Sequence, residues 1–290
     1  MKRITSILDM QAEAAAMRQA GHRLALVPTM GALHKAHLAL VEEAHRHADH
    51  VTVSIFVNPT QFAPGEDYER YPRPLEEDLA KLRAQGIADV VFVPGVEDMY
   101  PDGYDQHRTW VVVEELDRHL CGAFREGHFR GVTTVVTKLF LACKPHVAVF
   151  GLKDAQQFLI LRRMVRDLNF DVEMIGVPTV REPDGLAFSS RNVYLTPEER
   201  SQAVVLSQAV EAARRRVEAG EQRGEALVEA MLQTLAQAPL AQVQYAEVVD
   251  TETLQPVERL RPGQEVLAAV AVFFGTTRLI DNAFLRVPAS

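Results

Sequence analysis

Residues 22–59, HRLALVPTMGALHKAHLALVEEAHRHADHVTVSIFVNP, place a helical pattern between two short apolar runs. The runs within 22–28 and 50–59 are rich in Leu, Val and Ile on successive positions, as is typical of strands buried on both faces. Between them, the apolar residues at 38, 40, 41 and 44 fall on one face of a helix. A strand, a helix and a second strand in this order predict a βαβ unit with parallel strands.

The same alternation continues as far as residue 178. Further strands are expected at 88–94, 146–151 and 171–178, and helices at 74–86, 131–145 and 154–169. The first 21 residues carry charges within their apolar pattern, so we expect an amphipathic helix there rather than a signal peptide. Strands that alternate with helices predict a doubly wound parallel α/β sheet, Rossmann-like, in a domain formed by residues 1–179.

The pattern changes in the second part of the chain. A helix is expected at 196–220, where Thr196 and Glu199 form a capping box around Pro197, and another at 221–239. Strands are expected at 243–250, 265–275 and 277–285. Helices followed by strands predict a smaller α+β domain over residues 180–290.

Composition narrows the class of protein. The 290 residues carry a formal net charge of −8, from 31 Lys and Arg against 39 Asp and Glu, and contain no long basic run. We therefore expect no nucleic-acid partner. No apolar run is long enough to cross a membrane, and only Cys121 and Cys143 are present, so we expect a cytoplasmic protein with no membrane partner and no disulfide framework.

In a doubly wound sheet, ligands bind at the carboxyl ends of the strands, near the point where the strand order reverses. Polar residues follow four of the five expected strands. They are Thr29 to Gly31 with His34 and His37, Asn58 to Phe62, Gly151 to Asp154 with Gln157, and Arg181 to Asn192. Because parallel strands end at the same edge of a sheet, these groups predict one binding site there.

His34 and His37 lie near the start of the expected helix and share one of its faces. Imidazole N–H groups at a helix N-terminus suit an anion such as phosphate. Two other interpretations stay open, namely surface or capping histidines and zinc ligands. Zinc would need more ligands, and the sequence has neither an HExxH motif nor cysteines at ligand spacing, so no metal ligands are assigned in the protein. Gly31 is expected to let a nucleotide approach the backbone closely.

Lys153 and the segment FSSRN (188–192) carry further anion-binding groups. A lysine at a strand-to-helix junction can reach phosphate oxygens, and Asp154 can cap the helix that follows. The two serines and the arginine could grip phosphate, although an ordinary polar loop has the same composition. The glycine-rich motifs GxxxxGK[ST] and GxGxxG are absent, so a nucleotide would be held by side chains around a helix N-terminus.

These blocks resemble a known family. PTMGALHKAH (28–37) and SSRN (189–192) are similar to the phosphate-binding motifs of the nucleotidyltransferases related to class I aminoacyl-tRNA synthetases. With SIFVNPTQF, YPR, GHFRGVTTVVTKLF, GLKDAQQ and REPDGLAFSSRNVYL in order, the resemblance narrows to the pantothenate synthetase (pantoate–β-alanine ligase) family. It implies a homodimeric, ATP-dependent, AMP-forming ligase that uses Mg2+. Such an enzyme condenses (R)-pantoate with β-alanine through a pantoyl adenylate, a step in coenzyme A biosynthesis.

The resemblance also implies roles for single residues. The catalytic residues would be His34, His37, Lys153, Ser189 and Arg191. ATP would contact these five together with Met30, Gly31, Gly151, Asp154, Val180 and Ser190. Pantoate would contact Met30, Asn58, Gln61, Phe62, Tyr71, Arg125 and Gln157. The loop of residues 181–192 in the smaller domain would act as a lid that keeps water from the adenylate.

Two positions depart from the family pattern. Leu152 stands where Glu or Gln is expected, so a polar role there is lost, and Cys121 stands where some relatives carry an acid. Two alternative functions are a different nucleotidyltransferase of the same superfamily and a nucleotide-binding sensor without catalysis. A phosphorylated acceptor would call for more basic residues, and a sensor would bind ATP without pantoate-dependent release of AMP. The acidic net charge argues against a role in aminoacylating tRNA.

Overall fold

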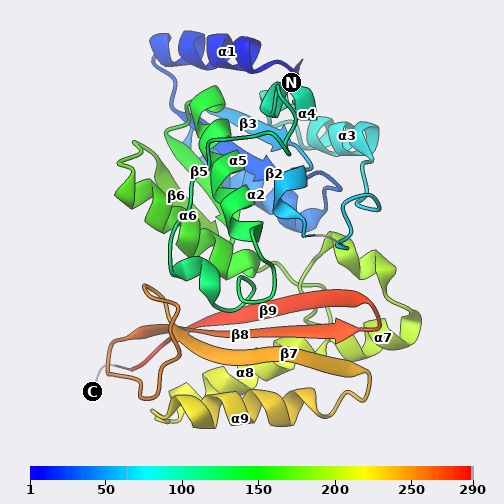
Figure 1. Cartoon of the computed structure of the whole chain (residues 1–290), viewed down its shortest axis with the longest axis vertical. Helices are drawn as coiled ribbons and strands as arrows, with labels where there is room; N and C mark the ends of the chain where they lie inside the picture. Colours follow the sequence, from blue (N-terminus) through cyan, green and yellow to red (C-terminus); the bar gives the residue numbers. More distant parts are fainter. Residues whose placement is uncertain (64, 289–290) are drawn as a thin grey trace. The chain divides into compact units, whose positions relative to one another are not determined.

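The structure is a computed structural model that describes residues 1–63 and 65–288. The chain divides into two compact units. The first comprises residues 1–117, 124–152 and 160–178, and the second comprises 118–123, 153–159 and the described residues from 179 onward. Each unit is built around its own sheet (Figure 1). The second unit thus includes two short segments from within the first 179 residues.

The first unit contains a six-stranded sheet in which every pair of neighbours is parallel. Its order is β1-β4-β3-β2-β5-β6. The bounds are Lys2–Ile4 (β1), Leu24–Thr29 (β2), His50–Ile55 (β3), Val90–Phe92 (β4), Val147–Gly151 (β5) and Glu173–Val177 (β6). The strand order reverses between β2 and β5, and this confirms the doubly wound fold. The residues after β2 and β5 therefore flank the switch point.

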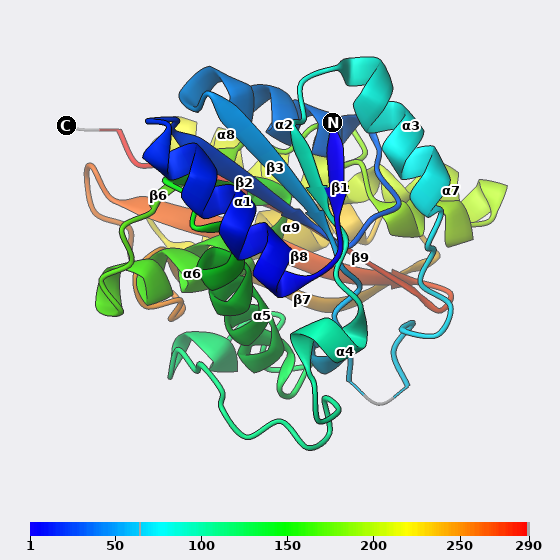
Figure 2. The ribbon, with the colours of Figure 1, turned by 90° about the horizontal axis from the view of Figure 1, so that it is seen from above.

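Helices cover both faces of this sheet (Figure 2). Helices α2 and α3 lie on one face, and α1, α5 and α6 lie on the other, as right-handed crossovers require. Their bounds are Ile7–Gln19 (α1), Lys35–His47 (α2), Leu75–Gln85 (α3), Val96–Met99 (α4), His128–Cys143 (α5) and Ala155–Asp167 (α6). Short 3-10 turns occupy Pro59–Gln61 (η1), Leu116–Arg118 (η2) and Leu152–Asp154 (η3). Leu40, Val41 and Ala44 of α2 pack on Val27 and Val53 of the sheet, which confirms the apolar face expected from the sequence.

The second unit contains the antiparallel sheet β7-β8-β9, formed by Ala241–Asp250, Glu265–Phe274 and Thr277–Arg286. Helices α8 (Val205–Glu218) and α9 (Gly224–Leu235) cover one face of it (Figure 1). Helix α7 (Pro197–Ala203) and the 3-10 turn η4 (Ser190–Tyr194) precede them. Thr196 Oγ1 accepts the Glu199 amide while the Glu199 carboxylate accepts the Thr196 amide, so the expected capping box is present.

Two expectations about elements were wrong. The first unit has a sixth strand, β1, because three residues at the chain start pair with β4 although they are too short to show a periodic pattern. The single helix expected at 196–220 is two helices that meet at Val204. No Gly or Pro marks this break, and Val204 between the two helices keeps helical φ and ψ, −58° and −23°.

Candidate active site

The loop between β2 and α2 presents the two histidines. Gly31 and Ala32 both have positive φ, +83° and +50°, and the chain turns there into α2. The rings of His34 and His37 stack with centroids 4.0 Å apart. The His34 amide donates to His37 Nδ1 at 3.3 Å, so the neutral His37 ring carries its proton on Nε2 and can donate from that atom. Two stacked imidazoles thus lie at the N-terminus of α2, beside the switch point.

A buried carboxylate in α3 holds this loop. Asp78, whose side chain is 1% exposed, accepts the amides of Ala32 and Leu33 at 2.8 and 2.7 Å. Lys81 of the same helix donates to the Leu33 carbonyl at 2.8 Å. A Cβ on Gly31 would lie 3.1 Å from Asp78 Oδ2, so this residue must be small as well as left-handed. The conformation of the turn before His34 is therefore fixed from α3.

The residues expected to bind pantoate in the first unit lie together. Gln61, in η1, donates from Nε2 to Met30 Sδ at 2.9 Å and accepts from Asn58 Nδ2 at 3.2 Å. The ring of Phe62 meets the edge of Tyr71 with centroids 5.9 Å apart. Asn58 is fully buried and also bonds to Gly131 of α5 and to Tyr100. This arrangement pairs a fixed amide with apolar walls, which suits a small polar substrate.

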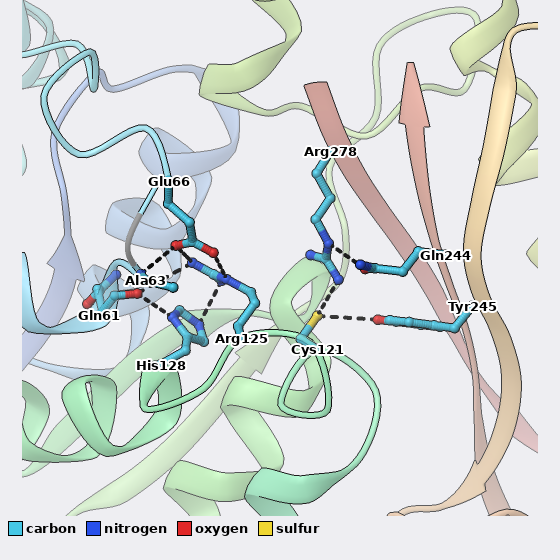
Figure 3. Close-up of polar contacts among 9 residues, drawn as sticks. All are labelled: Gln61, Ala63, Glu66, Cys121, Arg125, His128, Gln244, Tyr245 and Arg278. Carbon is cyan, nitrogen blue, oxygen red and sulfur yellow. Dashed lines mark hydrogen bonds and ion pairs between the residues drawn. The ribbon is translucent and has the colours of Figure 1, made fainter. Parts of the chain in front are cut away.

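Arg125 is engaged by other residues of the first unit (Figure 3). Its Nε and Nη2 donate to the Glu66 carboxylate at 2.6 and 2.7 Å, and its Nη1 lies 2.9 Å from His128 Nε2. His128 Nδ1 lies 2.7 Å from the Gln61 carbonyl, which can only accept. The neutral His128 ring therefore donates from Nδ1 and accepts from Arg125. Burial raises the pKa of Glu66, but the hydrogen bonds and charge of Arg125, with smaller effects of the Ala63 amide and His128, together outweigh it and leave this pKa below its ordinary value.

Lys153 and Asp154 follow the carboxyl end of β5. Gly151 is the last residue of β5, and Lys153 lies two residues on, in η3, where α6 is about to begin. The Lys153 ammonium lies 3.9 Å from the Asp154 carboxylate, and the Lys153 side chain is 21% exposed. A half-buried ammonium at this position can meet an anion with little further ordering of its side chain.

Ser189, Ser190 and Arg191 follow a tight hairpin that begins near Val180. The chain folds back there through an antiparallel bridge between Arg181 and Ala187. Ser189 caps η4 by accepting the Arg191 amide at 3.2 Å. Asn192 ties this turn back to the hairpin by donating to Glu182 and to the Ala187 carbonyl. The segment is thus ordered by its own hydrogen bonds.

Cys121 belongs to a polar cluster within the second unit (Figure 3). Its Sγ lies 3.3 Å from Tyr245 Oη and accepts from Arg278 Nη2 at 3.4 Å, while Arg278 Nε donates to Gln244. Burial, followed by the neighbouring thiol, raises the pKa of Tyr245 well above its ordinary value. The Cys121 amide donates to Gln156. These contacts fix the segment 118–123 to the sheet of the second unit and give Cys121 a packing role.

The sequence did not identify Asp78 or Glu66 as site residues. Asp78 shares the buried face of α3 with Leu79 and Leu82, and a charge inside an apolar stripe was the one signal that could have pointed to it. Glu66 gives no local signal, because its partner Arg125 is 59 residues away. Among residues 1–63 and 65–288, no group of three or more His, Cys, Asp or Glu could hold a metal ion.

Comparisons with known proteins identify the family of the chain. The family model described as pantoate-beta-alanine ligase matches residues 2–284. A pantothenate synthetase of Salinibacter ruber is 65% identical over 99% of both chains, and one of Thermotoga petrophila is 53% identical over 98% of this chain and 100% of its own.

Two solved structures extend the comparison. The pantothenate synthetase of Thermus thermophilus superposes with a TM-score of 0.90 at 48% identity, over 98% of this chain and 99% of its own. A pantoate-beta-alanine ligase of Francisella tularensis, complexed with beta-gamma ATP and beta-alanine, gives 0.78 at 33% identity, over 98% and 97% of the two chains. The chain therefore belongs to the pantoate–β-alanine ligase family, and it is an ATP-dependent ligase that joins pantoate to β-alanine.

Proposed function

We propose that the stacked imidazoles of His34 and His37, together with Lys153, bind the phosphates of ATP. The hydroxyls and guanidinium of residues 189–191 complete this phosphate site. Gly31, Gly151, Asp154 and Val180 line the rest of the nucleotide site, with Met30 between ATP and pantoate. The observation that carries the proposal is the position of the histidine pair, at the N-terminus of α2 beside the β2–β5 switch point.

In the first step, the pantoate carboxylate attacks the α-phosphorus of ATP and pyrophosphate leaves. This step brings two anions together, so N–H donors fixed at the phosphate oxygens lower the barrier. Gln61, Asn58 and Gln157 orient pantoate, while Phe62 and Tyr71 supply apolar walls. In the second step, the amine of β-alanine attacks the acyl carbon of the adenylate, and the amide forms as AMP leaves. The protein contributes positioning and electrostatic stabilisation at both steps.

Mg2+ fits this site as a companion of ATP. Mg2+ is usually bound by substrate phosphates with only one or two carboxylates, and the described residues offer no protein cage of three or more such ligands. When bound, it would neutralise charge on the departing pyrophosphate.

We also propose a cytoplasmic homodimer. The two cysteines are free and buried, as expected for a reducing compartment. No helix among the described residues is both long and apolar enough to cross a bilayer. Leu8 of α1 and Leu141 of α5 are 78% and 57% exposed, and Gln11 of α1 donates to the Leu141 carbonyl, so the two helices adjoin. Exposed leucines on adjoining helices suit a contact between copies, and sedimentation analysis would detect the dimer.

The proposed roles are tested by measuring pyrophosphate and AMP with each substrate omitted in turn. Pyrophosphate should require pantoate but not β-alanine, whereas AMP release should require both. His34→Ala and Lys153→Ala should each lower the rate of pyrophosphate release by about a hundredfold or more while the protein stays folded. Near-normal pyrophosphate release by either variant would refute its phosphate role.

A further inference from the structure

Two neighbouring residues of β9, Asp281 and Asn282, bond to two segments of the second unit that lead to the proposed phosphate site. One is the turn that carries Lys153, and the other is the hairpin that precedes Ser189–Arg191. They lie far along the chain from these segments, and neither has a role in the site proposed above. Both are buried, with exposed fractions of 2% and 8%. A buried carboxylate and a buried amide next to each other in one strand need specific partners, because an unsatisfied polar group is costly to bury.

Asn282 reaches the backbone of the segment that carries Lys153. Its Nδ2 donates to the Lys153 carbonyl at 2.7 Å, across 129 residues of sequence. The segment Leu152–Asp154 is a single 3-10 turn between β5 and α6. A hydrogen bond to its middle residue fixes the plane of that peptide group, and with it the direction in which the Lys153 side chain leaves the backbone.

Asp281 holds the hairpin that leads to Ser189–Arg191. Its two carboxylate oxygens accept from Arg181 Nη1 and Nη2 at 2.6 and 2.9 Å, a bidentate pair. Arg181 Nη1 also donates to the Gly185 carbonyl at 3.1 Å, so one guanidinium joins β9 to both ends of the hairpin turn. The backbone N–H of Asn282 donates to Asp281 Oδ1 at 2.8 Å, so the Asp281 carboxylate is also held by its own strand.

From these contacts we infer that Asp281 and Asn282 are positioning residues for ATP binding. Asn282 sets the peptide group of Lys153, and Asp281 sets the hairpin before Ser189–Arg191. The strand β9 thus fixes the positions of these two segments relative to each other within the second unit. This inference rests on the proposed phosphate role of Lys153, and its test is designed so that the two can fail separately.

The test measures binding of a non-hydrolysable ATP analogue by calorimetry to the full chain. Asn282→Asp keeps the shape of the side chain but replaces the donor with an oxygen that repels the Lys153 carbonyl. It should weaken binding about tenfold. Lys153→Ala should weaken binding as well. Because Asn282 acts through Lys153, the double variant should bind no more weakly than Lys153→Ala. If Asn282→Asp instead caused a general loss of structure, the double variant would bind more weakly than Lys153→Ala.

Gln264→Ala is the matched control. It removes an amide that bonds to Asp250 at the end of the sheet where β8 begins, away from Lys153 in the hydrogen-bond network, so it should lower thermal stability without changing analogue affinity. Arg181→Lys keeps the positive charge but loses the bidentate contact with Asp281. It should weaken analogue binding less than Asn282→Asp does, so the contributions of Asp281 and Asn282 can be told apart.

The outcomes separate the two claims. Normal binding by folded Asn282→Asp, or fully additive effects in the double variant, would overturn the positioning role while leaving the phosphate role of Lys153 intact. Normal binding by Lys153→Ala would refute the phosphate role itself, and the positioning role with it. Weakened binding that vanishes in the Lys153→Ala background supports both.

Discussion

Asp78 holds the backbone of the β2–α2 loop. Its carboxylate accepts two amides that lie 46 and 45 residues away in sequence. Asp78→Asn keeps the size of the side chain but replaces one acceptor with a donor that faces an N–H group. We expect a loss of about 1–3 kcal/mol in the free energy of unfolding. We also expect a higher KM for ATP with little change in KM for pantoate, measured by pyrophosphate release.

Asp98→Asn provides a comparison of the same chemistry in the same unit. Asp98 accepts one amide, that of Gly95, at 2.9 Å, and it is exposed at the start of α4. This variant should cost about 0.5–1 kcal/mol of stability and leave both KM values unchanged. If Asp78→Asn raised only the KM for pantoate, Asp78 would not act on the nucleotide side of the site.

Glu66 gives a pH dependence whose sign follows from its environment. Its pKa in the folded chain lies below the ordinary 4.5, since Arg125, the Ala63 amide and His128 together outweigh the effect of burial. The stabilisation is therefore present above about pH 4.5 and is lost as the pH falls through the lower, folded-state pKa. A Glu66→Gln variant cannot titrate at this position. The fall in its free energy of unfolding between neutral and acid pH should therefore be smaller than that of the unmodified protein, by on the order of 1 kcal/mol. Melting temperatures of both proteins between pH 7 and pH 3 would show this, and parallel curves would contradict it.

At the scale of elements, the contact between α5 and η1 depends on Gly131. A Cβ at this position would collide with the carbonyl of Thr60, and the Gly131 carbonyl accepts from Asn58. Gly131→Ala must push η1 away from α5 and displace Gln61. We expect a destabilisation of about 1–3 kcal/mol and a KM for pantoate raised about tenfold, from steady-state kinetics.

Gly86→Ala separates this effect from the general cost of replacing a glycine. Gly86 ends α3 with φ +74°, and a Cβ there would meet no atom within 4 Å. The substitution should cost roughly 1 kcal/mol through backbone strain and leave the KM for pantoate unaltered. An equal rise in KM for both variants would show that Gly131 has no special part in placing Gln61.

Helices and strands with a clear hydrophobic pattern were predictable from the sequence. The short strand β1 and the break between α7 and α8 were not. The strands β2 and β3 and the helix α2 show buried runs and a clear apolar face, and the structure has them within a few residues of the predicted bounds. The strand β1 was missed because three residues carry no period. The break at Val204 was missed because no Gly or Pro marks it and Val204 itself keeps helical φ and ψ, −58° and −23°.

At the scale of the whole molecule, the reactivity of the two cysteines allows the unfolding of each unit to be followed separately. Cys143 ends α5 in the first unit and Cys121 lies in the second, and both are buried. Burial raises the pKa of Cys143 far above its ordinary value, so little thiolate forms. Under native conditions, a colorimetric disulfide reagent should therefore react much more slowly than with the unfolded chain. In guanidinium both thiols should react, and the single Cys→Ala variants would assign each signal to its unit. Rapid labelling of native Cys143 would contradict its burial.

The candidate site was predictable where its residues follow strands in sequence, and unpredictable where they come from elsewhere in the chain. The switch-point rule placed His34, Lys153 and Gln61 at strand ends from local pattern alone. Some of their partners are local, such as Asn58 beside Gln61, but others come from distant positions, and a single sequence carries no trace of pairings such as Asn282 with Lys153. The sequence therefore predicts which side chains lie at the candidate site, while the distant residues that hydrogen-bond to them are identified only from the folded structure.

The long separation of Lys153 from Asn282 also has a consequence for synthesis on the ribosome. The chain emerges from its N-terminus at roughly 5–20 residues per second, so the 129 residues between these partners take on the order of ten seconds to make. During that interval the β2–α2 loop and its hydrogen bonds to Asp78 can already form. The hydrogen bond from Asn282 to the Lys153 carbonyl, however, cannot form until β9 has been made. If Lys153 binds ATP as proposed, a nascent chain would acquire its histidine pair well before its full ATP affinity, and that affinity would rise when β9 is complete.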